Sequence, residues 1–212
     1  MPLTKAKREQ SKKTVERILN AATSLFVAHG YHGTSISAIA KATGLTKGAL
    51  YAHFQGKGDL LLALVRKFEE EYLDQTIRVV DQTPGSAWDQ LQRYVSFSSY
   101  FAEQNRELCL LLTILSSEFS GAGHEEFESE FRRLYSKYAR FLRKVVEKGK
   151  HQGVFDSSLD THHLAYVIIA FHDGVLLQWQ RSKEFLDGPD FVRTYRRMFF
   201  HGINPLTEKN QT

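Results

Sequence analysis

The sequence predicts an all-α protein of about nine helices. Apolar residues recur every three to four positions through most of the 212 residues, which is the period of an amphipathic helix. Only four prolines are spread along the chain, so long helices are possible. No segment alternates apolar and polar side chains over more than a few residues, as a half-buried strand would. We therefore expect helices without a sheet, and no internal repeat is visible.

The first helix is expected to end near His29, with Gly30 as its stop. Its inward positions follow the helical period and are Val15, Ile18, Leu19, Ala22, Leu25 and Phe26. A second helix is expected around Ile36 to Ala40. Thr34 stands where an N-cap belongs, and Gly44 stands where a left-handed residue ends a helix.

A third, very short helix follows in "LTKGALYAHF". Thr46 is its expected cap, and Leu50 and Phe54 are its inward residues. Helices this short are unstable alone, so they must share a core with the first helix. Two helices joined by a tight turn containing Gly, the second very short, indicate a helix-turn-helix motif, whose second helix enters the major groove of DNA. Lys47 would supply charge there, and Gly48 would let the backbone approach the DNA closely.

Positive charge is concentrated in the same part of the chain. Residues 1–56 hold eight Lys or Arg and two Glu, a net charge of +6, whereas residues 57–212 hold twenty Lys or Arg and twenty-two Asp or Glu, a net charge of −2. A polyanion such as DNA favours this concentration, because bound phosphates release their counterions. A Lys-rich terminus is as often only a solvated tail, so the charge alone decides little.

The segment "LFVAHGYHGTSISAIAKATGLTKGALYAHFQGKGDLLLALV" from Leu25 to Val65 resembles the DNA-binding domain of the TetR family of bacterial transcriptional regulators. The matching positions have fixed spacing and are Gly30-Tyr31, Thr34-Ser35, Ile39-Ala40, Gly44, Thr46-Lys47-Gly48, Leu50-Tyr51, His53-Phe54, Lys57 and Leu60. Gly58 departs from the pattern, because the family often has an acidic residue there. This departure should cost some helix-dipole stabilisation and should leave DNA binding intact.

The resemblance implies a helix-turn-helix DNA-binding domain in residues 1–56 and a ligand-binding and dimerisation domain in residues 57–212. It also implies a role for each matched residue. Lys47 and Thr46 would act at or near bases, Gly48 would permit close approach, and the phosphate contacts would come from Thr34, Ser35, Tyr51, His53 and Lys57. Other readings stay open: the two threonines as caps only, Lys57 as a solvated charge, and Tyr51 packed on its own helix.

The rest of the chain predicts longer helices. They are expected from Leu60 toward Gln75 and over residues 86–105, 106–120, 124–152, 161–181 and 189–201, with "DQTPGSAW" as the break after the first of them and "GAGH" and "GVFDSSLD" as loops. The segment from Thr161 to Arg181 is apolar almost all round, so it must be covered on both sides. A symmetry mate is the commonest cover, which predicts a homodimer; a central helix inside one domain is the alternative.

The resemblance also implies a cavity for a small hydrophobic effector in each subunit. Aromatic side chains on helices that must face each other agree with this, since apolar pockets with few polar groups bind drug-sized molecules. The candidate residues are Tyr94, Phe97, Phe101, Phe131, Tyr135, Tyr138, Phe171 and His172. Core packing is the plainer reading of any single aromatic. His172 and Asp173 could orient a ligand, pair across the dimer or line a water site.

No cofactor, metal site or catalytic motif is expected. The nine His lack the two-His, one-Glu spacing of zinc proteases, Cys109 has no second Cys to join it, and no Gly-rich phosphate loop follows a strand. No apolar run reaches the roughly 18 residues of a membrane span, and no secretory signal is visible, so we expect a cytoplasmic protein. The predicted function is a regulator, and most simply a repressor, released from palindromic double-stranded operator DNA by a hydrophobic or aromatic effector. The alternative is an architectural or division-related DNA-binding protein without an effector.

Overall fold

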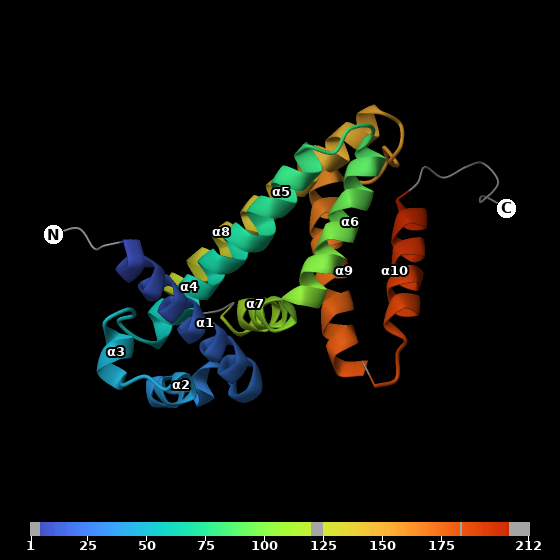
Figure 1. The fold of residues 1–212 in the computed structure, drawn as a ribbon. Helices are drawn as coiled ribbons and strands as arrows, with labels where there is room; N and C mark the ends of the chain where they lie inside the picture. The colour runs from blue at the N-terminus through green and yellow to red at the C-terminus, as the bar shows by residue number, and fades with distance from the viewer. Residues whose placement is uncertain (1–4, 120–124, 183, 204–212) are drawn as a thin grey trace. The chain divides into compact units, whose positions relative to one another are not determined.

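The computed structural model describes residues 5–119, 125–182 and 184–203, and every regular element in them is a helix. The expected "GAGH" loop lies outside the described residues. Because α4, a π-helical turn η1 and α5 follow each other without a break, the described residues form nine helical segments, as expected (Figure 1). In chain order the elements are α1 (Lys5–Gly33), α2 (Ile36–Thr43), α3 (Lys47–Tyr51), α4 (Lys57–Phe68), η1 (Glu69–Leu73), α5 (Asp74–Asp81), α6 (Ala87–Gln104), α7 (Arg106–Glu118), α8 (Glu125–His151), α9 (Thr161–Ser182) and α10 (Gly188–Gly202).

The chain packs as two compact units, each built from two separate stretches. Unit 1 comprises Met1–Phe68 and Glu107–Glu130, and unit 2 comprises Glu69–Arg106 and Phe131–Thr212. This division describes packing and differs from the functional boundary expected after residue 56. The functional division stays a prediction.

In unit 1, α1 packs on α2 and α4, and α2 packs on α3 (Figure 1). The helix path of α1 breaks at Gly30, whose φ of 73° and ψ of 163° lie outside the helical region. A residue with a side chain is strained at such a φ, so glycine suits this position. The predicted stop at Gly30 is therefore confirmed, with one further turn after it. The core of the unit includes Ile18, Leu19, Ala22, Phe26, Ile39, Leu50, Leu60 and Leu64.

An aromatic cluster joins the second stretch of unit 1 to the first. The Tyr31 ring lies 5.1 Å from Phe119, at the end of α7, and 5.8 Å from Phe127, at the start of α8. Phe127 also explains the departure at Gly58, because a Cβ on Gly58 would lie only 3.2 Å from Cζ of Phe127. A longer acidic side chain at Gly58 would have to displace this ring, so the glycine belongs to the packing of the cluster.

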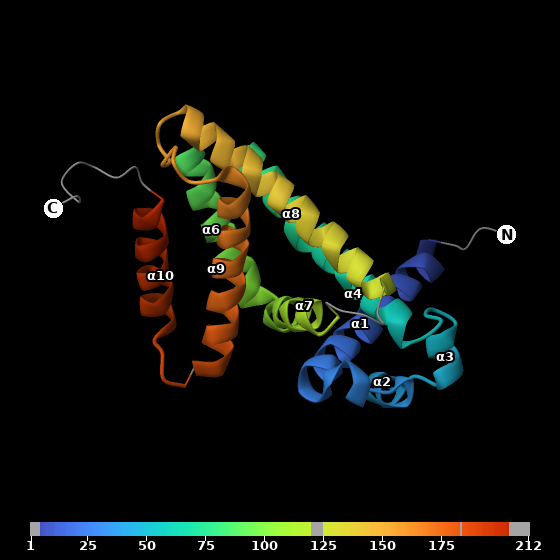
Figure 2. The same cartoon turned by 180° about the vertical axis from the view of Figure 1, so that it is seen from behind.

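In unit 2, α5 lies beside α8, and α6, α9 and α10 complete a helical bundle (Figures 1 and 2). The helix expected to run toward Gln75 continues to Asp81, with Thr76 and Val80 on its buried face, and it ends at the start of the expected "DQTPGSAW" break. The packing of α9 against α10 includes ring pairs such as Phe171 with Tyr195 at 6.4 Å. None of the helices in the described residues has the length and apolarity that crossing a membrane requires.

Candidate nucleic-acid interface and effector site

The turn between α2 and α3 has the geometry that its sequence predicts. Gly44 ends α2 with φ 65°, and its N–H donates to the Lys41 carbonyl at 3.2 Å. Thr46 begins α3, and its hydroxyl accepts from the Ala49 N–H at 3.1 Å. A left-handed glycine and a side-chain cap satisfy backbone groups that the helix ends leave open. Both assignments are confirmed, and together they form the tight turn of a helix-turn-helix.

The predicted cap of α2 was placed one residue too early. Ser35 is the N-cap, and its hydroxyl accepts from the Ala38 N–H at 3.1 Å. Thr34 is instead buried, with its hydroxyl within 2.9 Å of the Gly30 carbonyl and 3.0 Å of the Leu25 carbonyl. These bonds hold the end of α1, so the Thr34 hydroxyl is engaged inside the protein, whereas Ser35 is exposed.

The short helix α3 has one buried face and one exposed face. Leu50 and, just after the helix, Phe54 are buried, as expected. Lys47, Gly48 and Tyr51 are exposed, and 54% of the Tyr51 surface is accessible, so Tyr51 is not packed against its own helix. His53, after the helix, is half-buried.

Gly48 has no neighbour in the protein that demands a glycine. Its φ is not positive, and a Cβ there would have only the Thr46 hydroxyl near it, at 4.0 Å. The fold of this unit would therefore accept a side chain at Gly48. A partner that approaches the backbone closely would not.

Lys57 is neither solvated nor directed outward. Its ammonium donates to the backbone carbonyls of Tyr31 at 2.6 Å and Thr34 at 3.0 Å, and it lies 4.3 Å from the centre of the Tyr31 ring. Burial lowers the pKa of this ammonium below its usual value. The side chain therefore ties the start of α4 to the end of α1. The phosphate contact predicted for Lys57 is untested, and this ammonium already has protein acceptors.

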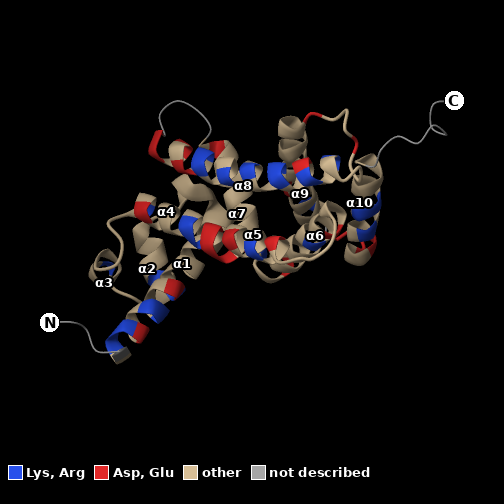
Figure 3. Ribbon diagram, turned by 90° about the horizontal axis from the view of Figure 1, so that it is seen from above, with Lys and Arg blue, Asp and Glu red and all other residues tan. Residues whose placement is uncertain are grey.

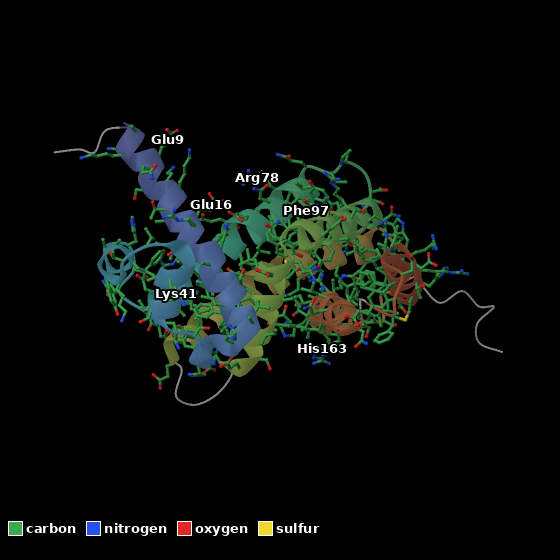
Figure 4. The ribbon with its side chains drawn as sticks, turned by 60° about the horizontal axis from the view of Figure 1, so that its bottom comes forward. Glu9, Glu16, Lys41, Arg78, Phe97 and His163 are labelled. Carbon is green, nitrogen blue, oxygen red and sulfur yellow. The ribbon has the colours of Figure 1, made fainter. Side chains whose placement is uncertain are left out.

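Positive charge lines the first turns of α1 (Figure 3). The exposed basic side chains of that helix are Lys7, Arg8, Lys12, Lys13 and Arg17, with Glu9 and Glu16 between them (Figure 4). Lys41 adds an exposed cation on α2 (Figure 4). An excess of cations on these two helices attracts the phosphate backbone of DNA and makes binding depend on salt.

Unit 2 contains a buried chain of four hydroxyl groups. Tyr72 in η1 shares hydrogen bonds with Ser98 of α6 at 2.8 Å and with Tyr138 of α8 at 2.7 Å, and Tyr138 shares one with Tyr94 of α6 at 2.5 Å. All four residues are at most 4% exposed. Burial raises the pKa of the Tyr94 and Tyr138 hydroxyls well above 10. These phenols therefore remain neutral hydrogen-bonding groups.

His172 of α9 borders this hydroxyl chain. Its ring stacks on Tyr72 at 5.8 Å and lies 6.4 Å from the Tyr94 ring. Its Nδ1 atom is buried, makes no hydrogen bond within the described residues, and lies 3.7 Å from the Asp173 carboxylate. The Tyr135 hydroxyl donates to that carboxylate at 3.2 Å. Both side chains are half-buried in the single chain, and the three roles that the sequence left open for His172 and Asp173 stay predictions.

The other predicted effector residues lie in unit 2 but spread beyond the hydroxyl chain. Phe101 is close, with its ring 5.1 Å from Tyr72, and the half-buried Phe97 stacks next to it at 6.4 Å (Figure 4). Phe171 instead packs toward α10, and Phe131 is buried in α8. The predicted aromatics therefore divide between a polar interior centre and ordinary packing.

Sequence reasoning missed both Tyr72 and Ser98 as site residues. Tyr72 enters the interior from η1, whose helical turn carries one residue more than an α-turn. Nothing in the sequence "EEEYL" indicates the change from an α-helical to a π-helical turn. The available signal was weaker: a Tyr that continues the inward face of α4, opposite two further tyrosines.

Comparison with known proteins agrees with this geometry. Residues 18–64 match the family described as bacterial regulatory proteins, tetR family. The probable acrEF/envCD operon repressor of Escherichia coli K12 is 26% identical over 222 aligned positions, covering 99% of this chain and 97% of the relative. The crystal structure of the MbdR regulator from Azoarcus sp. CIB superimposes with a TM-score of 0.81 and 29% identity, covering 90% of this chain and 98% of that one.

A more distant structure shares the fold. The transcriptional regulator FadR from Bacillus subtilis, solved in complex with stearoyl-CoA, superimposes with a TM-score of 0.74 at 19% identity, covering 89% of this chain and 99% of that one. Residues 18–64, which contain the helix-turn-helix, therefore match the tetR family of bacterial regulatory proteins, and the rest of the chain is similar to regulators that align over almost the whole length.

Proposed function

We propose that this transcriptional regulator is a dimeric repressor that leaves a palindromic operator when a hydrophobic or aromatic small molecule enters unit 2. The observation that carries the DNA-binding part is α3, whose back is buried through Leu50 while Lys47, Gly48 and Tyr51 face outward. Such a helix presents its first turn to base edges, and the neighbouring Ser35, Thr46 and His53 to bases or phosphates. Thr34 and Lys57 act mainly by holding the motif together.

The proposed dimer reads two half-sites. Two recognition helices related by a two-fold axis contact sites about 34 to 36 Å apart, or a multiple of that distance. The relative in Escherichia coli is named a probable operon repressor, which supports repression as the mode of action. Since the relatives are regulators, we propose binding rather than catalysis as the activity.

The effector part rests on the interior of unit 2. A buried polar group without a partner is costly unless water or a ligand completes its hydrogen bonds, and His172 Nδ1 is such a group within the described residues. The FadR structure of the same fold holds stearoyl-CoA, which agrees with a hydrophobic effector.

DNA selected from the organism's genome by the purified protein tests the proposal. The enriched fragments should share an inverted repeat. Replacing Lys47 by Ala should weaken binding to that repeat by about 1 to 3 kcal/mol and relax its sequence preference, as measured by fluorescence anisotropy. Lys144→Ala, an exposed change on α8 in unit 2, is the matched control and should leave affinity unchanged. Unaltered affinity and footprint for Lys47→Ala would remove Lys47 from the interface.

The alternative function, an architectural or division-related DNA-binding protein, makes a different prediction. Calorimetric titration of an effector into free and operator-bound protein separates the two functions. A repressor released by its effector must bind that effector more weakly when it holds DNA, because coupling between two sites is reciprocal. Equal affinities in both states would favour the architectural function.

A further inference from the structure

The hydroxyl chain of unit 2 has one proton more than it has internal bonds. Ser98, Tyr72, Tyr138 and Tyr94 form a linear chain with three shared hydrogen bonds. Each hydroxyl carries one proton, so four protons serve three links. The surplus donor can lie at any of the four hydroxyls, and it lies at an end when all three links run in one direction, which is the order that an acceptor placed beside an end stabilises. The ends are Ser98 and Tyr94, and each hydroxyl makes only its bond within the chain among the described residues.

His172 adds a nitrogen atom that can form a further hydrogen bond beside this chain. Its buried Nδ1 has no hydrogen-bond partner in the described residues, and its ring stands against Tyr72 and Tyr94. The centre therefore combines a surplus hydroxyl donor, an imidazole nitrogen and aromatic faces. Such an arrangement suits an oxygen atom carried by an apolar or aromatic molecule, because the rings contact the apolar body while the polar atoms fix the oxygen.

The local charge selects among oxygen groups. Asp173 accepts from Tyr135 and lies 3.7 Å from His172 Nδ1, and its negative charge helps to raise the pKa of Tyr94. The basic side chains of Arg133 and Lys137 are already paired with Glu69, at 2.5 and 2.7 Å. A carboxylate would meet the Asp173 field and would lose its hydration without gaining a cation of its own. A ketone, an ester or another neutral carbonyl would meet neither penalty.

We propose that the Tyr94, Ser98 and His172 centre recognises the neutral carbonyl oxygen of a hydrophobic effector and discriminates against the corresponding carboxylate. This inference rests on the proposed effector function, whose ligand class it specifies. The carbonyl oxygen accepts a hydrogen bond from the surplus hydroxyl, and the apolar body lies against the rings of Tyr72 and Phe101.

Two matched sets of probes test this selectivity on the full-length protein. The aromatic set is acetophenone, ethylbenzene and benzoate, and the alkyl set is 2-octanone, octane and octanoate. Within a set the molecules have similar size and differ in the oxygen group. In at least one set the ketone should bind at least about tenfold more tightly than both analogues, as one added hydrogen bond allows. Competition against an environment-sensitive fluorescent probe measures all six on one scale.

Two variants assign the preference to the centre. Tyr94→Phe and Ser98→Ala each remove a terminal hydroxyl, and at least one should reduce the ketone's advantage over the hydrocarbon to about twofold or less. Hydrocarbon affinity should stay unchanged, which separates this effect from unfolding. Tyr31→Phe, a change at a buried tyrosine of unit 1, is the control and should leave all affinities as they were.

Each remaining result overturns the inference: no ketone preference in either set, a preferred carboxylate, a preference that survives both variants, or no binding at millimolar concentration. Operator binding is measured in parallel with the same ketones. Selective ketone binding that leaves operator affinity unchanged would overturn the proposed regulation but not the ligand class. Release of the operator by the carboxylate but not by the ketone would overturn the ligand class and leave the proposed regulation standing.

Discussion

Lys57 connects two helices through one ammonium group, and this arrangement makes a prediction about stability. Its bonds to the Tyr31 and Thr34 carbonyls are charge-assisted. Lys57→Met keeps the aliphatic length and removes these bonds, so it should lower the free energy of unfolding by about 1 to 2 kcal/mol, toward the low end of the range because the site is half-buried. Urea unfolding followed by circular dichroism measures the loss.

The control for Lys57 is Lys144→Met, which alters an exposed residue of α8. It should change stability by less than about 0.5 kcal/mol. A Lys57→Met protein of normal stability that binds every DNA sequence less tightly, with a smaller salt dependence, would contradict the structural role. That result would restore the phosphate contact expected from the sequence.

Single residues show which signals a sequence carries plainly. Gly30, Gly44 and Thr46 were predicted correctly because positive φ and helix capping are local requirements that few residue types meet. The choice between Thr34 and Ser35 was wrong because adjacent Thr and Ser can both cap. Only the tertiary bonds of Thr34 to the end of α1 decide which hydroxyl turns inward.

At the scale of the element, two basic side chains of α8 hold η1 through its first residue, Glu69. Arg133 and Lys137 donate to its carboxylate, and these bonds lower its pKa from 4.5 to about 2. The carboxylate is ionised in the folded state at a lower pH than in the unfolded chain. Its contribution to stability is therefore complete above pH 4.5 and is lost as the pH falls toward 2.

A shift of this size corresponds to about 3 kcal/mol. Glu69→Gln should be less stable than the wild type at pH 7, and the difference should shrink as the pH falls from 5 toward 2. Chemical unfolding at each pH measures it. Glu147→Gln, which alters an exposed ion pair with Arg143, should show almost no difference at any pH. A constant gap between Glu69→Gln and wild type would mean that packing, not ionisation, carries the effect.

A second prediction at this scale concerns the end of α8. A Cβ on Gly149 would lie 2.0 Å from a ring carbon of Phe155, which is buried against the helix. Gly149→Ala should therefore destabilise the protein by about 1 to 3 kcal/mol, despite the better helix propensity of alanine. In a Phe155→Ala background the same change should cost much less, because its obstacle is gone. Equal costs in both backgrounds would refute the steric explanation.

The bounds of whole helices were easier to predict than the π-helical turn η1, which interrupts a continuous helix. The apolar spacing placed α6, α8, α9 and α10 to within a residue or two at each end, because those faces are continuously amphipathic. The π-helical turn is different, since its first residue, Glu69, is bound by Arg133 and Lys137, more than sixty positions away. The hydroxyl chain joins Tyr72 to side chains 26 and 66 positions away on α6 and α8, so it could not be found from spacing alone.

At the scale of the whole molecule, the proposed dimer has a specific test. Tyr166 and Val167 on α9 are 42% and 45% exposed in the single chain, whereas Leu176 on the same helix is buried. Val167→Glu should place an unpaired carboxylate in the proposed seam and shift the protein to monomers with little operator affinity. Sedimentation velocity measures the first effect and anisotropy the second.

The matched change is Lys144→Glu on the exposed face of α8, which should leave the dimer intact. A Val167→Glu protein that sediments as a dimer and binds its operator normally would move the interface away from this part of α9. Leu176→Glu would be a poor probe, because a charge inside the protomer would unfold it before it separated two subunits.

The division of the molecule was the hardest property to predict. The change of charge after residue 56 and the short helices indicated a functional boundary there, but packing assigns residues 107–130 to the same unit as the first 68. Contacts such as Ser24 with Glu107 at 2.6 Å join residues 83 positions apart. Such contacts leave no periodic pattern in the sequence, so only the folded chain reveals them.

This interleaved packing sets an order of events during synthesis. Tyr31 completes its aromatic contacts with Phe119 and Phe127 only after both have left the ribosome. At about 5 to 20 residues per second, the chain from residue 69 to residue 130 takes about 3 to 12 seconds to make. During that interval the Tyr31 ring of the nascent N-terminal stretch lacks its contacts with Phe119 and Phe127. The packing of unit 1 is therefore complete only after residues 107–130 have been made.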